Sequence, residues 1–167
     1  SKAQFLAISE SFEDNLINKI IPFWYGTKWS FEGHSNEPNK GEIACGYFVS
    51  TMLKHMGFNV NRYKLAQQLP INEAYSLSLS SEVINVKGQS FKDIAEEFYE
   101  VLNDGVYFIG INKNHVGIIY RKSNQIFLIH SNYFSGFVEM ERIEESQVMK
   151  CFNNFYITPL SENKELM

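Results

Sequence analysis

The amino-acid sequence predicts an α+β domain in which N-terminal helices pack on a C-terminal antiparallel β-sheet. Before Gly105, apolar residues recur at spacings of three and four, which is the period of a helix with one buried face. After Gly105 the chain changes to short β-branched and aromatic segments separated by polar turns. Helices followed by strands are typical of α+β folds, and 167 residues suit a single domain.

Four segments have the pattern of helices, and each is followed by a stop signal. Pro22 ends the first segment, and Gly57 is a natural C-terminal stop for the second. Pro70 ends the third, while Ser90 is a suitable N-cap for the fourth, which stops at Gly105. The predicted helices span residues 11–21, 42–56, 63–69 and 90–102, and the serine-rich residues 71–88 receive no assignment.

The strands that follow are consecutive and closely spaced, which predicts an antiparallel meander. They are expected at residues 106–112, 115–120, 125–133, 136–143 and 151–158. The chain after Pro159 is polar, so we expect residues 161–167 to form a loose tail. Residues 1–160 are then one domain.

The composition excludes several classes of protein. The net charge is −4 and no basic stripe is visible, which argues against a nucleic-acid partner. No apolar run approaches the roughly 18 residues of a membrane span, and no signal peptide is visible. The chain begins with Ser1 instead of Met, which is compatible with an export signal that has already been removed. The oligomeric state is left undetermined.

Two cysteines are present, too few for a disulfide scaffold. Cys151 lies in an apolar and aromatic stretch, and we interpret it as a small residue of a strand or the core. Cys45 lies where the second predicted helix begins. A helix N-terminus favours a thiolate through its free N–H groups and its positive dipole end, so Cys45 is the candidate nucleophile.

A nearby imidazole would activate the thiol as a thiolate–imidazolium pair. The four histidines are His34, His55, His115 and His130. His55 follows Cys45 on the same helix by about 15 Å, too far to touch it. His115 begins one predicted strand, and His130 lies near the end of the next. If residues 121–124 form the turn, the two lie directly opposite each other on one face, and a one-residue slip would separate them.

Ordinary packing is the competing interpretation of these residues. A cysteine at a helix start, or two histidines on adjacent strands, is more often a packing feature than a catalytic one. The order along the chain favours catalysis, because Cys45 precedes His115 by 70 residues in a helix-then-sheet arrangement suited to a papain-like cleft. On the residues alone, both interpretations stay open.

Several motifs resemble those of the NlpC/P60 family of papain-like cysteine peptidases. In that family an aromatic-Gly pair precedes an Asp-Cys-Ser-Gly helix start, a His-Val-Gly-Ile-Tyr strand supplies the base, and an Ile-His-Ala-like motif supplies the third polar residue. The matching segments, within roughly residues 15–143, are Tyr25-Gly26, Cys45-Gly46-Tyr47-Phe48-Val49, Asn114-His115-Val116-Gly117-Ile118-Ile119-Tyr120 and Phe127-Leu128-Ile129-His130-Ser131.

The resemblance implies a cysteine hydrolase that cleaves an amide bond through a thioester acyl-enzyme. Cys45 is then the nucleophile, His115 the base and His130 the residue that orients it, with Asn132 as the alternative orienting group. Tyr25 matches the upstream tyrosine that lines the site. The remaining assignments are a second oxyanion donor from Tyr25 or His34 and a substrate groove lined by Trp29, for which ordinary packing is the alternative. No metal or cofactor is needed.

The implied substrate is a peptide, above all a bacterial peptidoglycan stem peptide, which would place the protein in the cell envelope, the periplasm or outside the cell. Two residues depart from the family pattern: Ala44 replaces an Asp that holds the free amine of the stem peptide, and Gly46 replaces a Ser. The departure at Ala44 leaves the usual γ-D-glutamyl-diaminopimelate bond in question. Residues 63–89 are longer than the simplest family members need and are a candidate lid, cleft wall or insertion.

Four other functions compete with hydrolysis of peptidoglycan. The same triad would serve an acyltransferase or an isopeptidase outside the cell wall, and a decayed enzyme fold would serve as a binding module. Cys45, His115 and His130 are also ligand types that suit zinc, although a catalytic triad explains them better. The acidic cluster at residues 139–145 is interpreted as a solvated face.

Overall fold

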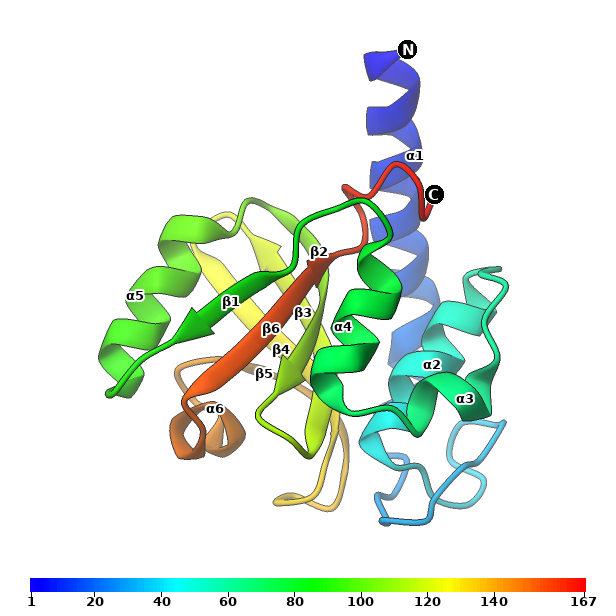
Figure 1. Ribbon diagram of the computed structural model, residues 1–167. Coiled ribbons are helices and arrows are strands. Elements are labelled where there is room, and N and C mark those ends of the chain that lie inside the picture. Colours follow the sequence, from blue (N-terminus) through cyan, green and yellow to red (C-terminus); the bar gives the residue numbers. More distant parts are fainter.

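The computed structural model describes all 167 residues and contains one six-stranded sheet with six α-helices around it (Figure 1). The predicted α+β class is therefore confirmed. The helices are α1 (Lys2–Asp14), continued by a π-helical segment (Asn15–Ile20) and a 3₁₀ turn (Ile21–Trp24), α2 (Cys45–His55), α3 (Arg62–Ala66), α4 (Pro70–Ser78), α5 (Phe91–Val101) and α6 (Gln147–Cys151). The strands are β1 (Ile84–Lys87), β2 (Gly105–Ile111), β3 (His115–Lys122), β4 (Gln125–Asn132), β5 (Phe137–Arg142) and β6 (Asn154–Pro159).

The sheet has the strand order β1-β6-β2-β3-β4-β5, and every neighbouring pair is antiparallel. Strands β2 to β5 are the predicted meander. Strand β6 returns to the other side of β2 and carries the short strand β1 at the edge. Sequence analysis left β1 unassigned, because its four residues lie in the serine-rich stretch between two helices.

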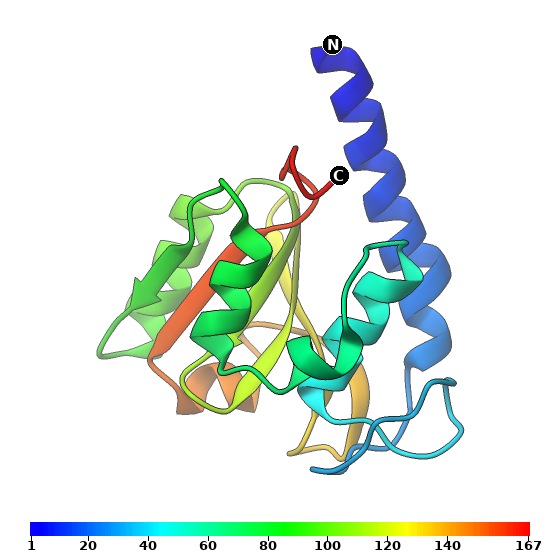
Figure 2. The same ribbon diagram turned by 45° about the vertical axis from the view of Figure 1, so that its right-hand side comes forward.

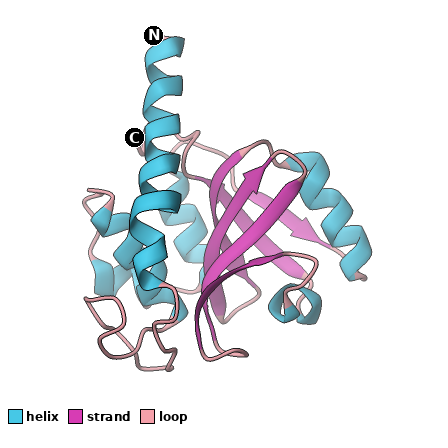
Figure 3. Cartoon of the chain, turned by 180° about the vertical axis from the view of Figure 1, so that it is seen from behind, coloured by secondary structure: helices cyan, strands magenta, loops and turns pink.

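Two hydrophobic cores lie on the two faces of the sheet. The first core joins α1 to α4 with apolar residues of the strands, for example Phe48 of α2 with Ile118 of β3. The second joins α5 and α6 with the opposite face, for example Phe98 of α5 with Phe155 of β6, whose rings make an edge contact at 5.5 Å between centroids. Figures 1 and 3 show α1 on one side of the sheet, with α5 and α6 away from it. The first turns of α1 project beyond the rest of the fold (Figure 2).

Three predictions about individual elements need correction. Helix α1 begins at Lys2, nine residues before the predicted start, because a capping box formed by Ser1 and Gln4 closes its first turn. Pro70 begins α4 instead of only ending the helix before it, since the first turn of a helix needs no N–H from proline. Cys151 is not a buried strand residue: it ends α6 and is exposed. None of the helices has the length and apolar character of a membrane span.

The tail predicted to be loose is packed against the domain in part. Ser161 is buried, and its hydroxyl accepts a hydrogen bond from the backbone N–H of Val106 at 2.9 Å. Asn163 is also buried, and its Nδ2 donates to the backbone oxygen of Ser78 at 3.0 Å. The polar residues on which the prediction of a loose tail depended therefore include two that make buried hydrogen bonds to β2 and α4.

The predicted turn between β3 and β4 is wrong by two residues. Lys122 pairs with Gln125, which leaves a two-residue loop in which Ser123 has a φ of +54°. Two-residue loops suit the twist of a hairpin better than the four-residue loop that we expected. A shift of two residues keeps every side chain on its face, so His115 and His130 still share one, now as diagonal neighbours.

Candidate active site

Cys45 is the first residue of α2, where sequence analysis expected it, and it is partly exposed. The N-cap residue, Ala44, makes no side-chain capping hydrogen bond. The N–H groups in the first turn of a helix have no intrahelical partners, so those beside Cys45 are left free for an anion. The Asp-to-Ala departure from the family pattern thus leaves uncapped N–H donors beside the sulfur.

The departure at Gly46 has a packing cause. A Cβ atom added at Gly46 would lie 2.7 Å from the backbone oxygen of Ala66 at the end of α3. A serine is therefore excluded unless α3 moves away from α2. Gly46 allows the segment after α2 to press against the turn that carries Cys45.

Replacing Gly46 by alanine is expected to lower the free energy of unfolding by about 1–3 kcal/mol, because the added methyl group overpacks the contact with Ala66. Urea denaturation monitored by circular dichroism measures the change. Lys54→Ala is the matched control, since Lys54 is exposed on the same helix and its truncation should change stability by less than about 0.5 kcal/mol. Equal stability of the two variants would contradict the close contact.

The two histidines form a buried hydrogen-bonded pair. Nε2 of His115 lies 2.7 Å from Nδ1 of His130, and the rings meet edge to face with centroids 5.0 Å apart. Gly117 makes this approach feasible, because a Cβ there would lie 3.1 Å from the Cβ of His130. The structure therefore brings together the two histidines that the sequence singled out.

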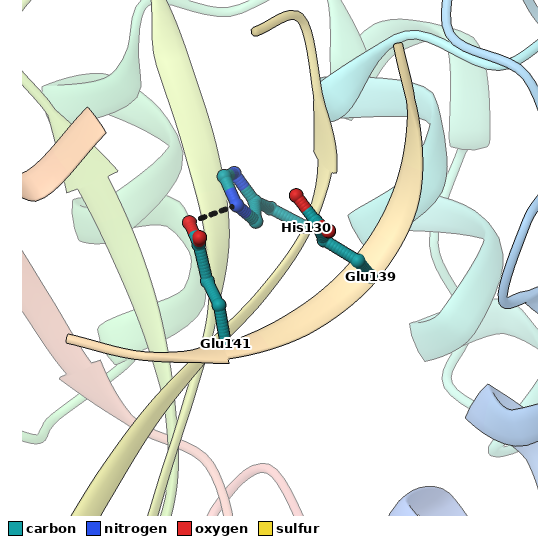
Figure 4. Close-up of side chains that lie close together, drawn as sticks. All are labelled: His130, Glu139 and Glu141. Carbon is teal, nitrogen blue, oxygen red and sulfur yellow. Dashed lines mark hydrogen bonds and ion pairs between the residues drawn. The ribbon is translucent and has the colours of Figure 1, made fainter. Parts of the chain in front are cut away.

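Glu141 extends the pair into a chain of three groups. Nε2 of His130 lies 3.0 Å from a carboxylate oxygen of Glu141, which reaches across from β5 (Figure 4). Burial alone would raise the pKa of the Glu141 carboxyl, but hydrogen bonds from His130 and Ser146 lead to a value below the ordinary one. An ionised carboxylate only accepts hydrogen bonds, so Nε2 of His130 carries the proton and donates it.

This donor assignment fixes the tautomer of His115. A neutral His130 that donates through Nε2 has a lone pair on Nδ1, which accepts the N–H of His115 Nε2. A neutral His115 that donates through Nε2 then has its own lone pair on Nδ1. That atom is buried and has no hydrogen-bond partner. The free lone pair is what a general base requires.

The prediction that the acidic cluster at residues 139–145 is a solvated face is wrong for two of its residues, Glu139 and Glu141, which make hydrogen bonds inside the fold. The alternation of β5 turns Glu139 and Glu141 toward the face of His130, and Glu139 accepts a hydrogen bond from Nδ2 of Asn132 at 2.6 Å. One ligand atom from each of His130, Glu139 and Glu141 lies within 4.8 Å of the others, a spacing that a metal site could use. Hydrogen bonds to protein partners account for this closeness, so we assign Glu141 to orienting His130. Cys45 and His115, the other two residues of the zinc interpretation, are not part of this group.

The alternative orienting residue, Asn132, does not take that role. Its Nδ2 donates to Glu139, and its Oδ1 accepts from the backbone N–H of Phe134 at 2.9 Å. Asn132 therefore holds the turn after β4, and His130 alone contacts His115 among the two candidates.

Tyr25 and His34 do not line the cavity that contains Cys45. The hydroxyl of Tyr25 instead points to Sδ of Met140 at 3.8 Å. The ring of His34 packs on aromatic neighbours, including Tyr47 at 5.9 Å between centroids. Its Nδ1 lies 2.9 Å from the backbone oxygen of Glu32, two residues earlier. The prediction of an oxyanion donor or site tyrosine from these two residues has no support in the geometry.

Cys45 and His115 line one cavity of about 360 Å³. Trp29 lines it too, as predicted, because the backbone around residues 26–29 pairs with the edge of β5, where Trp29 N–H donates to the Gly136 oxygen at 2.8 Å. Tyr133 packs between these residues, with its ring centroid 6.1 Å from that of Trp29. It lies 5.3 Å from the ring centroid of His115.

The segment at residues 63–89 supplies the opposite wall of this cavity. Residues 66–68 and 70 line it, and so does Glu73 on α4. Of the roles considered for this segment, the structure favours a cleft wall. Sequence analysis missed Glu73, although its place between Pro70 and Leu77 on the buried stripe of α4 was a signal, since a charged residue interrupts an apolar face there.

The electrostatics of the resting site favour neutral groups. Burial raises the pKa of the Cys45 thiol to about 11, against a smaller lowering effect from the backbone of Val116. Burial, together with the neighbouring His130, holds the pKa of His115 well below its ordinary value. At neutral pH the pair is therefore a thiol and an imidazole. The thiolate–imidazolium pair that we predicted is not the resting state.

Alkylation of Cys45 by iodoacetamide is expected to be slow at mildly acidic pH and to accelerate about tenfold per pH unit through the neutral range, because only the thiolate reacts. The rate should be followed by mass spectrometry in a Cys151→Ala chain, which leaves Cys45 as the only thiol. A fast and pH-independent reaction near pH 5 would contradict the neutral pair and restore the ion pair.

No family model, curated protein or solved structure matches the chain. The geometry of the site and the motifs in the sequence are therefore the basis for proposing a function.

Proposed function

We propose that this protein is a cysteine hydrolase of the papain-like NlpC/P60 type that cleaves an amide bond in peptidoglycan stem peptides. The observation that carries the proposal is the hydrogen-bonded chain from Glu141 through His130 to His115. It leaves the free Nδ1 of a buried histidine in the same cavity as a cysteine at a helix N-terminus. A packing histidine gains nothing from an unpartnered buried nitrogen, whereas a general base requires one.

In the first half of the reaction, Nδ1 of His115 removes the thiol proton while Sγ of Cys45 attacks the carbonyl carbon. The positive charge that forms on the imidazole is balanced through His130 by the Glu141 carboxylate. The carbonyl oxygen becomes an oxyanion that the free N–H groups at the start of α2 can bind. Because the resting pair is neutral, Cys45 is activated by general-base catalysis at the moment of attack.

In the second half, His115 gives its proton to the leaving amine as the C–N bond breaks, which leaves a thioester on Cys45. Water then attacks the thioester while Nδ1 of His115 accepts one of its protons. The C–S bond breaks, the carboxylic acid leaves, and the thiol regains its proton. The chain of His130 and Glu141 holds the imidazole in one tautomer throughout, so the same nitrogen serves both steps.

The choice of peptidoglycan depends on the motif resemblance and is supported by the shape of the site. A cavity of about 360 Å³ with aromatic side chains such as Trp29 suits a short peptide. Such a substrate would place the protein outside the cytoplasm. The uncapped helix start at Ala44 indicates that the family's usual amine contact is made elsewhere or not at all.

Digestion of purified peptidoglycan, with mass analysis of the released fragments, tests the proposal. We expect the wild-type protein to release fragments whose masses identify the cleaved amide. Absence of release at every pH from 5 to 9, from protein whose fold is verified by circular dichroism, would overturn the peptidoglycan substrate.

A catalytically inactive binding module is the second candidate, and one observation favours it. Nδ1 of His115 makes no hydrogen bond to the Cys45 thiol, and the thiol has a raised pKa. A binding module would retain peptidoglycan in a sedimentation assay without releasing fragments. Retention that is unchanged in a His115→Ala variant, with no products, would favour this candidate over the hydrolase.

A further inference from the structure

Glu73 is a buried acid that the proposed reaction does not use. It lies on α4 with no exposed surface (0%), and it lines the same cavity as Cys45. Neither carboxyl oxygen has a hydrogen-bond partner. Burial raises the pKa of this carboxyl well above its ordinary value, and no neighbouring charge lowers it.

The protein itself supplies no partner for this group. Glu73 is in no ion pair, and the one basic side chain that lines the cavity, Lys113, is exposed and leaves the pKa of Glu73 unaffected. Buried polar atoms are almost always hydrogen-bonded, and a buried carboxyl without a partner is less stable than one in water. An unpartnered group at a cavity wall is therefore expected to meet its partner on a ligand.

We propose that Glu73 binds a positively charged ammonium group of the substrate, and that the substrate class is an amide with such a group close to the scissile bond. This inference rests on the proposed function, because the bound ligand is a substrate only if the protein is a hydrolase. The contact comes from α4, not from the residue before the nucleophile.

The rest of the cavity suits a cation. Trp29, Phe31 and Tyr133 line it with aromatic rings, whose faces attract ammonium groups. These rings enclose a single carboxyl, which an ammonium group would stabilise in its ionised form. An anionic or neutral ligand would leave the Glu73 carboxyl without a charged partner.

The neighbourhood of Cys45 also favours pairing. Glu73 is close enough that its negative charge raises the pKa of the Cys45 thiol. An ionised and unpaired Glu73 would therefore oppose formation of the thiolate during attack. An ammonium group bound to an ionised Glu73 cancels that charge, so a cationic substrate can bind without raising the pKa of the thiol further.

The wall that carries Glu73 is held firmly in place. The carbonyl oxygen of Pro70 lies 2.8 Å from where a Cβ at Gly110 would be, so α4 begins directly against β2. The hydroxyl of Thr158 donates to the Ala74 oxygen at 2.8 Å. A carboxyl on such a rigid element is pre-organised for a ligand and cannot swing out to water.

Binding is tested without relying on activity, by carbon-13 NMR of the full chain labelled at glutamate carboxyls. The probe is n-butylammonium chloride, with 1-butanol as the neutral counterpart of similar shape, and the Glu73→Gln spectrum assigns the signal. We expect n-butylammonium to move the Glu73 resonance to the ionised position and lower its midpoint of titration, while 1-butanol does neither. An unchanged Glu73 signal, or the same response to both probes, would overturn the inference.

The kinetic arm uses a peptide that spans the amide bond identified by the fragment masses, with its amino groups free and after N-acetylation, which removes the charge. A charged hydrogen bond in the site predicts a preference of about 10- to 100-fold in kcat/KM for the free amine. Glu73→Gln keeps the shape of the side chain and one acceptor oxygen but removes the negative charge, so it should abolish the preference. If this variant does not fold, the preference of the wild-type protein for the free amine still decides.

The outcomes separate this inference from the proposed function. Cleavage without any preference for the free amine would overturn the role of Glu73 and leave the hydrolase intact. A Glu73 response to n-butylammonium without cleavage of any peptide would do the reverse, leaving a cation-binding cavity and no hydrolase.

Discussion

Replacement of Cys45 by alanine is expected to abolish amide hydrolysis, lowering kcat by roughly 10⁴- to 10⁶-fold. No other thiol lines the cavity, because the second cysteine, Cys151, ends α6 and is exposed. The measurement is the release of fragments from peptidoglycan, followed by mass spectrometry over time. A thioester on Cys45, trapped by rapid acid quench of the wild-type reaction, should be missing in the variant.

Cys151→Ala is the matched control, since it removes the exposed thiol and should leave the rate within about twofold. The thermal midpoint of each variant verifies that both fold. Undiminished release by Cys45→Ala would exclude a cysteine mechanism. Equal loss in both variants would point to a requirement for both thiols that the structure does not provide.

Replacement of His130 by alanine is expected to lower kcat by roughly 10²- to 10⁴-fold with little change in KM. Without His130, Nε2 of His115 loses its 2.7 Å hydrogen bond, and the tautomer with a lone pair on Nδ1 is no longer enforced. The acid limb of the pH–rate profile provides a second readout. Burial and His130 both lower the pKa of His115, so the substitution should move this limb to higher pH.

His130→Gln and Glu141→Gln are the controls for this prediction. The first keeps an oxygen acceptor for His115 and should recover part of the lost rate. The second removes the charge that fixes His130, and we expect a smaller loss, about 10-fold. Loss of rate in His130→Ala without any displacement of the acid limb would indicate a structural role and contradict the positioning role.

The placement of Cys45 at a helix start and of the histidines in adjacent strands could be predicted from local patterns. Apolar spacing over residues 42–56 and the stop at Gly57 depend on neighbours in sequence, and Gly57 has the expected positive φ of 92°. The prediction that His115 and His130 share a face is correct although the predicted turn is wrong, because the register differs by two residues and side chains alternate with a period of two. Their roles in catalysis stay predictions.

Glu73 and Glu141 were not found, because their meaning arises from tertiary contacts. Glu141 has the alternation of an exposed strand residue, and only the pairing of β5 with β4 brings it to His130. The exclusion of a serine at Gly46 likewise depends on the return of the chain at Ala66. Local patterns locate the candidate nucleophile and the candidate base, but the contacts around them depend on the tertiary fold.

The position of β6 in the sheet has a consequence for how the site is assembled during synthesis. Residues 154–163 reach the fold last, yet Thr158 and Asn163 hold α4 through hydrogen bonds at 2.8 and 3.0 Å. A nascent chain that has emerged only to the end of β5 already contains Cys45 and the histidine pair, whereas the wall with Glu73 still lacks its anchors. The wall that carries Glu73 would thus be completed after the segments that contain Cys45 and the two histidines.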